Sequence, residues 1–262
     1  MEKRRAHWTE YGIEATCLAL FMMAAAGMAT LLQHPASPLA GWSGSPLLQR
    51  IPMGVAMGLT CAALIYSPLG ARSGAHMNPS VTLTFLRLGK IAPLDAAGYV
   101  AAQFGGGVAG VAIATWALNG LPADPSVNYA ATVPGQAGSG VAFVAEVLIS
   151  FVMMSVVLRM SNAPRLAPFT GIGAGVLVAT YIVLEAPFSG MSMNPARSLG
   201  SNLPAALLSP LWIYFTAPPI GMLLAGEWYA RRHGLAQVRC AKLHHPRSAR
   251  CIFHCSHKES IT

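Results

Sequence analysis

A single motif occurs twice in this chain, as Ser-Gly-Ala-His-Met-Asn-Pro-Ser at residues 73–80 and as Ser-Gly-Met-Ser-Met-Asn-Pro-Ala at residues 189–196. Five of the eight positions are identical. Each copy occupies the same place within its own set of apolar segments, so the repeat indicates a duplicated membrane fold and not a chance match. The two copies also indicate where the functional centre is expected.

The composition is that of an integral membrane protein. Apolar residues make up 54% of the chain and charged residues 10%, and windows such as 15–32 and 171–184 contain no charge. In a soluble protein the net charge of +8 would suggest a nucleic-acid partner. Here the Lys and Arg residues lie mainly at the ends of apolar segments, so the charge indicates membrane orientation, and no nucleic-acid partner is expected.

Six apolar segments are each long enough to cross a hydrocarbon core of roughly 30 Å. They run from Tyr11 to Leu32, Ile51 to Leu69, Pro93 to Leu118, Gly140 to Met160, Ala167 to Ala186 and Leu211 to Ala230. The loop positions of Lys and Arg place both termini on the cytoplasmic side. We therefore expect an all-α protein of the lipid bilayer of the cell (plasma or inner) membrane, with six transmembrane helices and cytoplasmic termini.

The two motifs predict a pair of re-entrant half-helices. Three spans per half is an odd number, so the second half enters the membrane in reversed orientation and the motifs approach from opposite faces. The stretches Ser80 to Leu88 and Ala196 to Leu207 are too short to cross the bilayer but long enough for half-helices. Asn-Pro is a strong helix start, so Asn78 and Asn194 are predicted to be N-caps.

Two half-helices that meet near the midplane direct their positive ends and two amide side chains at one spot, which suits a neutral hydrogen-bonding solute. Glu14 and Glu146 take matching early positions in the first span of each half, and we expect them to support the two loops. The alternative is that both are interfacial side chains that reach toward water. His76 is expected to pack neutrally in its loop, with a pH gate as the alternative.

The chain divides into a cytoplasmic N-terminus (1–10), a channel domain (11–232, with halves 11–120 and 135–232) and a tail (233–262). The tail is basic and contains Cys240, His244, His245, Cys251, His254, Cys255 and His257. Because the spacing of these residues matches no strong zinc pattern, no metal site is predicted. A polar, basic segment without apolar periodicity is expected to be disordered near anionic lipid.

At this point the sequence resembles the aquaporin and glycerol-facilitator family, the major intrinsic proteins, over 11–232. The resemblance rests on the two Asn-Pro boxes, the Ser-Gly-Ala-His context of His76, Arg197 after the second box, and the paired Glu14 and Glu146. It implies a bundle with a pore in each protomer, usually a homotetramer, that passes water or small uncharged solutes. It implies no cofactor and no enzymatic step.

The resemblance also implies which residues form the pore. Its asparagine boxes correspond to Asn78, Pro79, Ser80, Asn194, Pro195 and Ala196. Its selectivity filter corresponds to Arg197, Met191, Ile182 and either Gly58, by direct counting, or Met57, by matching the following Gly-Leu-Thr. Water-selective members usually carry histidine at the position of Ile182, so its absence here leaves strict water selectivity open.

The leading functional hypothesis is a passive channel for water, and for small solutes such as glycerol, that excludes protons and ions. One alternative is an ion-coupled transporter, because inverted repeats and broken helices occur there too. Another is a membrane scaffold protein with a closed pore. The sequence leaves open the physiological solute, gating, the oligomeric state and the role of Glu185, which was expected either to support the second loop or to attract cations. No cysteine is expected near the filter, so mercurial reagents are expected not to block flow there.

Overall fold

The computed structural model describes residues 6–246 and 250–256, and within these residues it is built from helices without strands. The five elements of the first half are α1 (Trp8–Gln33), α2 (Pro46–Tyr66), α3 (Pro68–Ser73), α4 (Pro79–Arg87) and α5 (Pro93–Ala117). Those of the second half are α6 (Gly138–Asn162), α7 (Thr170–Leu184), α8 (Ala186–Ser189), α9 (Pro195–Asn202) and α10 (Leu211–His233). Short 3₁₀ turns at Leu121–Ala123, Asn128–Ala130, Ala167–Phe169 and Leu235–Gln237 connect them.

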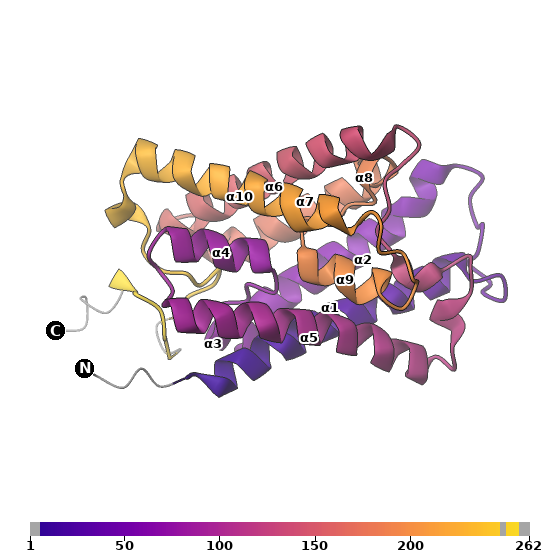
Figure 1. The fold of residues 1–262 in the computed structure, drawn as a ribbon, viewed down its shortest axis with the longest axis horizontal. Coiled ribbons are helices and arrows are strands. Elements are labelled where there is room, and N and C mark those ends of the chain that lie inside the picture. The colour runs from indigo at the N-terminus through magenta and orange to yellow at the C-terminus, as the bar shows by residue number, and fades with distance from the viewer. Residues whose placement is uncertain (1–5, 247–249, 257–262) are drawn as a thin grey trace.

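The order long, long, short, short, long is therefore repeated, as the duplicated motif predicts. α1 packs on α5 and α6 packs on α10, while α2 and α7 pack against each other between the halves. The half-helices α4 and α9 lie roughly in line between the long helices, with α4 in the half of the molecule near both termini and α9 in the other half (Figure 1). The two short helices thus enter the bundle from opposite ends.

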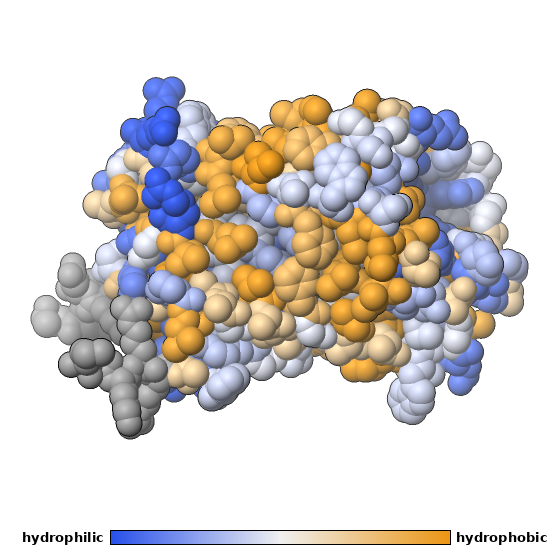
Figure 2. Space-filling view, in the orientation of Figure 1, coloured by the Kyte–Doolittle hydropathy of each residue, from blue (hydrophilic) through white to orange (hydrophobic). Residues whose placement is uncertain are grey.

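Five of the described helical segments are long and apolar enough to cross a membrane, namely α1, α2, α5, α6 and 167–184. The sixth predicted span is α10, which has 23 residues and contains Pro218 and Pro219. It lies along α6 as α5 lies along α1. Apolar residues form a broad band around the middle of the visible face, and hydrophilic residues gather toward its two ends (Figure 2). This is the surface expected of a bilayer-spanning bundle.

The central contact between α2 and α7 depends on glycine. A Cβ atom added to Gly58 would lie 2.5 Å from the carbonyl oxygen of Gly175, and one added to Gly175 would lie 2.5 Å from that of Gly58. The two backbones therefore approach more closely than any other side chain allows. This reciprocal contact places the two repeats around a common centre.

Several boundaries differ from those expected. α2 begins at Pro46, a favourable first helical residue, and ends at Tyr66, because Ser67 accepts a hydrogen bond from Gly70 N (3.0 Å) and starts α3. α9 ends at Asn202 and not at 207, because Pro204 has no backbone N–H group to continue the helical hydrogen bonds.

The tail differs most from the expectation. Residues 234–246 and 250–256 form an irregular strap across the end of the bundle that holds the N-terminus, where a disordered segment was expected; 247–249 and 257–262 lie outside the described residues. Val238, Ala241, Lys242 and Phe253 are buried in this strap. The buried residues of the first segment include a consecutive run, 240–243, that contains Lys242, and such a run follows neither the helical nor the strand period, so the sequence pattern did not reveal the packing.

Candidate pore and selectivity site

The two asparagine boxes meet and brace each other. The Nδ2 atom of Asn78 donates to Met193 O at 2.7 Å, and that of Asn194 donates to Met77 O at 2.7 Å. Their Oδ1 atoms cap the half-helices: Asn78 accepts from Ser80 N (2.8 Å), and Asn194 accepts from the two backbone N–H groups that follow Pro195. Each amide has two N–H donors, so one donor of each side chain is not needed by these contacts.

The loops before the asparagines are held in an unusual backbone conformation. Ala75 and Met77 have φ values of 56° and 49°, and Met191 and Met193 have values of 51° and 53°. Residues other than glycine rarely adopt positive φ, and they persist there only when the surrounding structure fixes them. The same positions are affected in both repeats, so the strain belongs to the motif.

Two fully buried glutamates fix these loops. Glu14 accepts from Ser73 Oγ (2.7 Å), His76 N (3.1 Å) and Met77 N (2.7 Å). A fourth donor, Gln103 Nε2, lies 2.9 Å away on α5.

Glu146 repeats the arrangement in the second half. It accepts from Ser189 Oγ, Ser192 N and Met193 N, each at 2.7 Å. Both carboxylates are 0% exposed, so neither reaches interfacial water, and the contacts are those a loop support makes.

A cavity of about 450 Å³ passes both asparagine boxes. Its lining follows α2 from Pro46 to Ile65, which at 1.5 Å per residue corresponds to about 28 Å, close to the thickness of a hydrocarbon core. Asn78, Asn194 and Arg197 supply polar groups to a wall that is otherwise mostly apolar. The cavity therefore has the length and lining of a transmembrane pore.

Arg197 is placed by a loop that the sequence did not single out. Its Nη1 atom donates to Thr132 Oγ1 and lies 3.5 Å from Ser201 Oγ. The backbone of Thr132 is fixed in turn by Asn202, which accepts from Thr132 N and donates to Thr132 O, both at 2.8 Å. Thr132 lies in the connection between the halves, where no pattern distinguishes it from its neighbours.

Not all of the remaining predicted filter residues line the cavity. Met191 and Ile182 line the cavity, as does Met57. Gly58 instead faces α7, because one residue along a helix turns a side chain by about 100°. Of the two alternatives left open by the sequence, Met57 is the one that contacts the cavity.

The proline, serine and alanine of the boxes are packed and not exposed to the cavity. Pro79 and Pro195 are the first residues of α4 and α9, and Ser80 and Ala196 are 0% exposed. The Ala196 carbonyl lies so close to α5 that a Cβ on Gly107 would approach it to 2.5 Å. These residues fit the half-helices against the long helices.

Two further polar residues lie near the cavity or the second loop. Cys61, which the sequence analysis did not single out, lines the cavity one helical turn from Met57. Glu185 is 8% exposed and lies beside Ser189 of the second loop, so its role stays open between loop support and attraction of cations.

His76 packs in its loop among aromatic rings. Its Nε2 atom lies 2.8 Å from Ala241 O in the tail, and its Nδ1 atom lies 3.0 Å from Thr82 Oγ1. A carbonyl oxygen only accepts, so Nε2 carries the proton. The ring is stacked between Phe85 and Phe253, at centroid distances of 5.2 and 5.5 Å.

Fold and site together define a polytopic helical membrane protein with an inverted repeat and a mostly apolar cavity into which Asn78, Asn194 and Arg197 bring polar groups. The sequence model of the major intrinsic protein family matches residues 4–229. The chain therefore belongs to the major intrinsic protein family, a family of membrane channels, as the resemblance predicted.

Named relatives and a solved structure agree with this assignment. The chain is 34% identical over 219 residues to the glycerol uptake facilitator protein-like 6 of Lactiplantibacillus plantarum, covering 80% of this chain and 93% of that protein. It is 35% identical over 176 residues to aquaporin NIP1-3 of Oryza sativa subsp. japonica, covering 66% of this chain and 59% of the plant protein. The X-ray structure of the aquaglyceroporin from Plasmodium falciparum matches with a TM-score of 0.70 at 18% identity, over 86% of this chain and 96% of that one. The predicted aquaporin-like fold is thereby confirmed.

Proposed function

We propose that this protein is a passive channel that conducts water and small uncharged solutes, with glycerol among them. The observation that carries the proposal is the cavity of about 450 Å³, which is lined by both box asparagines and by Arg197. Membership of a channel family and the name of the bacterial relative, a glycerol uptake facilitator, support the same function.

Selection follows from the groups at the constriction. The second amide donor of Asn78 and of Asn194 is available to the oxygen of a passing solute. The half-helices α4 and α9 direct their positive ends toward the same region, and the guanidinium of Arg197 adds a full positive charge, so cations are opposed by the local field. A neutral molecule with hydroxyl groups meets donors without meeting that barrier.

The apolar side of the filter sets the solute size. Met57, Met191 and Ile182 line the cavity and present carbon and sulfur to the solute. An apolar wall opposite hydrogen-bond donors matches a solute with a carbon backbone and hydroxyl groups along one side, which is the chemistry of glycerol.

We further propose a homotetramer in the cell membrane with both termini cytoplasmic. Orientation is supported by the accumulation of Lys and Arg at the end of the bundle where the termini lie, including Arg72, Arg87 and Arg231. Assembly is supported by membership of the family, in which homotetramers are usual. Crosslinking and mass photometry in lipid nanodiscs test the assembly.

The transport proposal is tested by stopped-flow light scattering of proteoliposomes. Shrinkage against an impermeant osmolyte reports water, and re-swelling in glycerol reports the solute. Met191→Trp places a large side chain in the cavity and is expected to return both rates to those of empty liposomes. Rates that depend on an ion gradient would instead support a coupled transporter, and baseline rates of the well-inserted native chain would support a closed scaffold.

A further inference from the structure

Four side chains of the C-terminal strap converge on one point. The Sγ atoms of Cys240, Cys251 and Cys255 and one ring nitrogen of His245 all lie within 4.8 Å of one another. The Cys240 and Cys251 Sγ atoms are 3.5 Å apart, and Cys255 Sγ is 3.3 Å from His245 Nε2. These four residues are not part of the pore.

The distances are close to those of a tetrahedral metal site. With metal–sulfur bonds of 2.3 Å and metal–nitrogen bonds of about 2.05 Å, two thiolates of a tetrahedron are about 3.8 Å apart and a thiolate and an imidazole nitrogen about 3.5 Å apart. The two short distances observed here differ from those values by about 0.3 Å or less. A metal ion therefore fits between the four atoms with small rotations of the side chains.

The separation of these four residues in the sequence is also compatible with a metal site. The ligands form two pairs, Cys240 with His245 and Cys251 with Cys255, separated by four and three residues respectively. Paired ligands on short loops are typical of structural zinc sites. The tail, 233–262, contains eight Cys and His residues, and the strap brings the side chains of four of them together.

Charge and access are suitable as well. Zn²⁺ with three thiolates carries a net charge of −1, and Lys242, a buried residue, interacts electrostatically with all three cysteines. Cys240 is buried, whereas the other three ligands are half-buried, so an ion has a route from solvent. The ammonium group of Lys242, which donates to the carbonyl oxygens of Ala71 and Arg250, thereby gains a negatively charged neighbour.

We propose that Cys240, His245, Cys251 and Cys255 bind one Zn²⁺ ion, or a cation of similar preference for thiolate and imidazole, and that this ion fastens the strap over one end of the pore.

The fastened strap contacts the first pore loop directly. Between the first pair of ligands, the Ala241 carbonyl accepts from His76 Nε2 (2.8 Å), and Leu243 N donates to Gly74 O (3.1 Å). The Leu243 side chain is part of the cavity wall. Between the second pair, Phe253 stacks on His76 at 5.5 Å. Both tail segments that a bound metal would join, 240–245 and 251–255, therefore contact the same pore loop.

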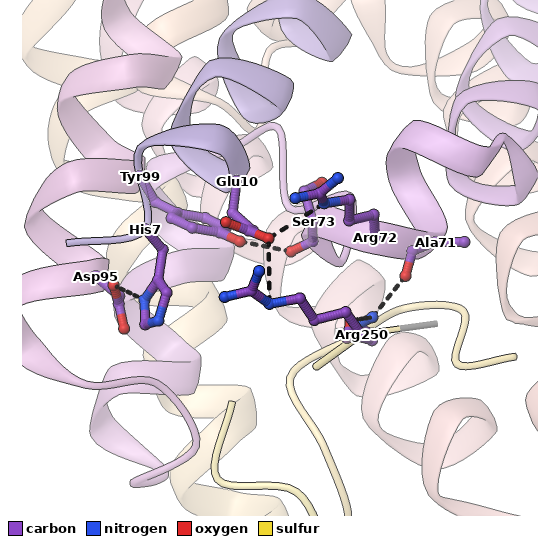
Figure 3. A network of polar contacts seen from close by, with 9 residues as sticks. His7, Glu10, Ala71, Arg72, Ser73, Asp95, Tyr99 and Arg250 are labelled. Carbon is purple, nitrogen blue, oxygen red and sulfur yellow. Dashed lines mark hydrogen bonds and ion pairs between the residues drawn. The ribbon is translucent and has the colours of Figure 1, made fainter. Parts of the chain in front are cut away.

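The strap is also held at its edge by an ion pair. Arg250 Nε lies 4.0 Å from Glu10 Oε1 on α1, beside Arg72 Nε at 3.2 Å (Figure 3). The arginine of each pair is 41% or 64% exposed, so water weakens its attraction to Glu10. Metal coordination is much stronger than these contacts. Occupancy of the metal site would therefore decide whether Leu243 and Phe253 stay at the pore end.

The first test measures metal content without reference to transport. Full-length protein, purified under a phosphine reductant and supplied with Zn²⁺, is analysed by inductively coupled plasma mass spectrometry after desalting. We expect one zinc per chain in the native protein, loss of that zinc in Cys251→Ser and in Cys255→Ser, and retention in Cys61→Ser, a cysteine outside the cluster. Substitution with Co²⁺ should give the intense visible spectrum of a tetrahedral thiolate site. Zinc content equal to that of a variant lacking all four ligands would overturn the proposal.

A second test concerns the strap, and its transport arm rests on the proposed channel function. Hydrogen exchange of residues 238–256 is expected to slow when Zn²⁺ is added to the native chain and to remain fast in Cys251→Ser. Chelation is expected to raise water permeability in liposomes that carry the cytoplasmic side outward. Zinc binding with unchanged exchange and unchanged permeability would refute the fastening of the pore end. A chain that binds zinc but conducts nothing would instead refute the channel function, so the two failures are distinguishable.

Discussion

Replacing Glu146 with glutamine tests the idea that a buried carboxylate holds the second pore loop in its strained conformation. The carboxylate accepts from Ser189 Oγ and Ser192 N on one oxygen and from Met193 N on the other, each at 2.7 Å. An amide keeps one acceptor oxygen and replaces the other with a donor. The best orientation leaves Met193 N–H facing another N–H group.

The cost can be estimated from these bonds. Hydrogen bonds to a charged group contribute about 1.5–3 kcal/mol and neutral ones about 1, so losing one and weakening two removes about 4 kcal/mol. Burying a neutral amide in place of a charge returns part of this, which leaves a destabilisation of about 2–4 kcal/mol. Met193 O also accepts from Asn78 Nδ2, so a displaced loop disturbs the centre of the pore.

Glu185→Gln is the matched control. Glu185 is a buried glutamate of the same half, but in the part of the chain that the structure describes it accepts none of the backbone N–H hydrogen bonds by which Glu146 holds the second loop. Equilibrium unfolding in mixed micelles, followed by circular dichroism, should place Glu146→Gln about 2–4 kcal/mol below the control, with reduced water permeability in liposomes. Agreement of the two variants within about 0.5 kcal/mol would refute the assignment of Glu146 as a loop support.

Three further outcomes are expected. Mercurial reagents should reduce water flow in the native channel through Cys61 on the cavity wall, and Cys61→Ser should resist them; block that persists in this variant would contradict the assignment. Arg197→Val removes the positive charge at the constriction and should admit protons, measured with a pH-sensitive dye inside liposomes, whereas an unchanged proton leak would show that the half-helices suffice. Ile182→His replaces an apolar side chain of the cavity wall with a polar ring and should lower the ratio of glycerol permeability to water permeability about tenfold, equivalent to about 1.4 kcal/mol. Equal losses of both permeabilities would indicate a damaged fold instead.

Much of the site was accessible from the sequence because the Asn-Pro boxes are local. Asparagine followed by proline starts a helix wherever it occurs, and the repeat of Glu14 at Glu146 is visible by counting. The structure adds the contacts between the boxes, in which each asparagine donates to a carbonyl of the opposite loop. Such contacts depend on how two distant halves pack, and no local pattern encodes them.

Two other features of the site could be found only from the tertiary structure. Thr132 lies in a connecting loop without periodicity, and it is important only because Asn202 and Arg197 come to it in space. The choice between Met57 and Gly58 depended on the rotation of α2 against α7, which the Gly58–Gly175 contact fixes.

The sequence by itself determined the class of protein. A hydrocarbon core requires long apolar helices, which the composition of the chain reveals. A motif duplicated after an odd number of spans requires an inverted repeat, which the spacing of the two copies reveals. The tertiary structure alone decided that the tail is a strap over the pore end and that four of its Cys and His side chains meet at one point. Residues separated in sequence become ligands or walls only when packing brings their atoms within a few ångströms, and that distance is a property of the fold and not of the spacing.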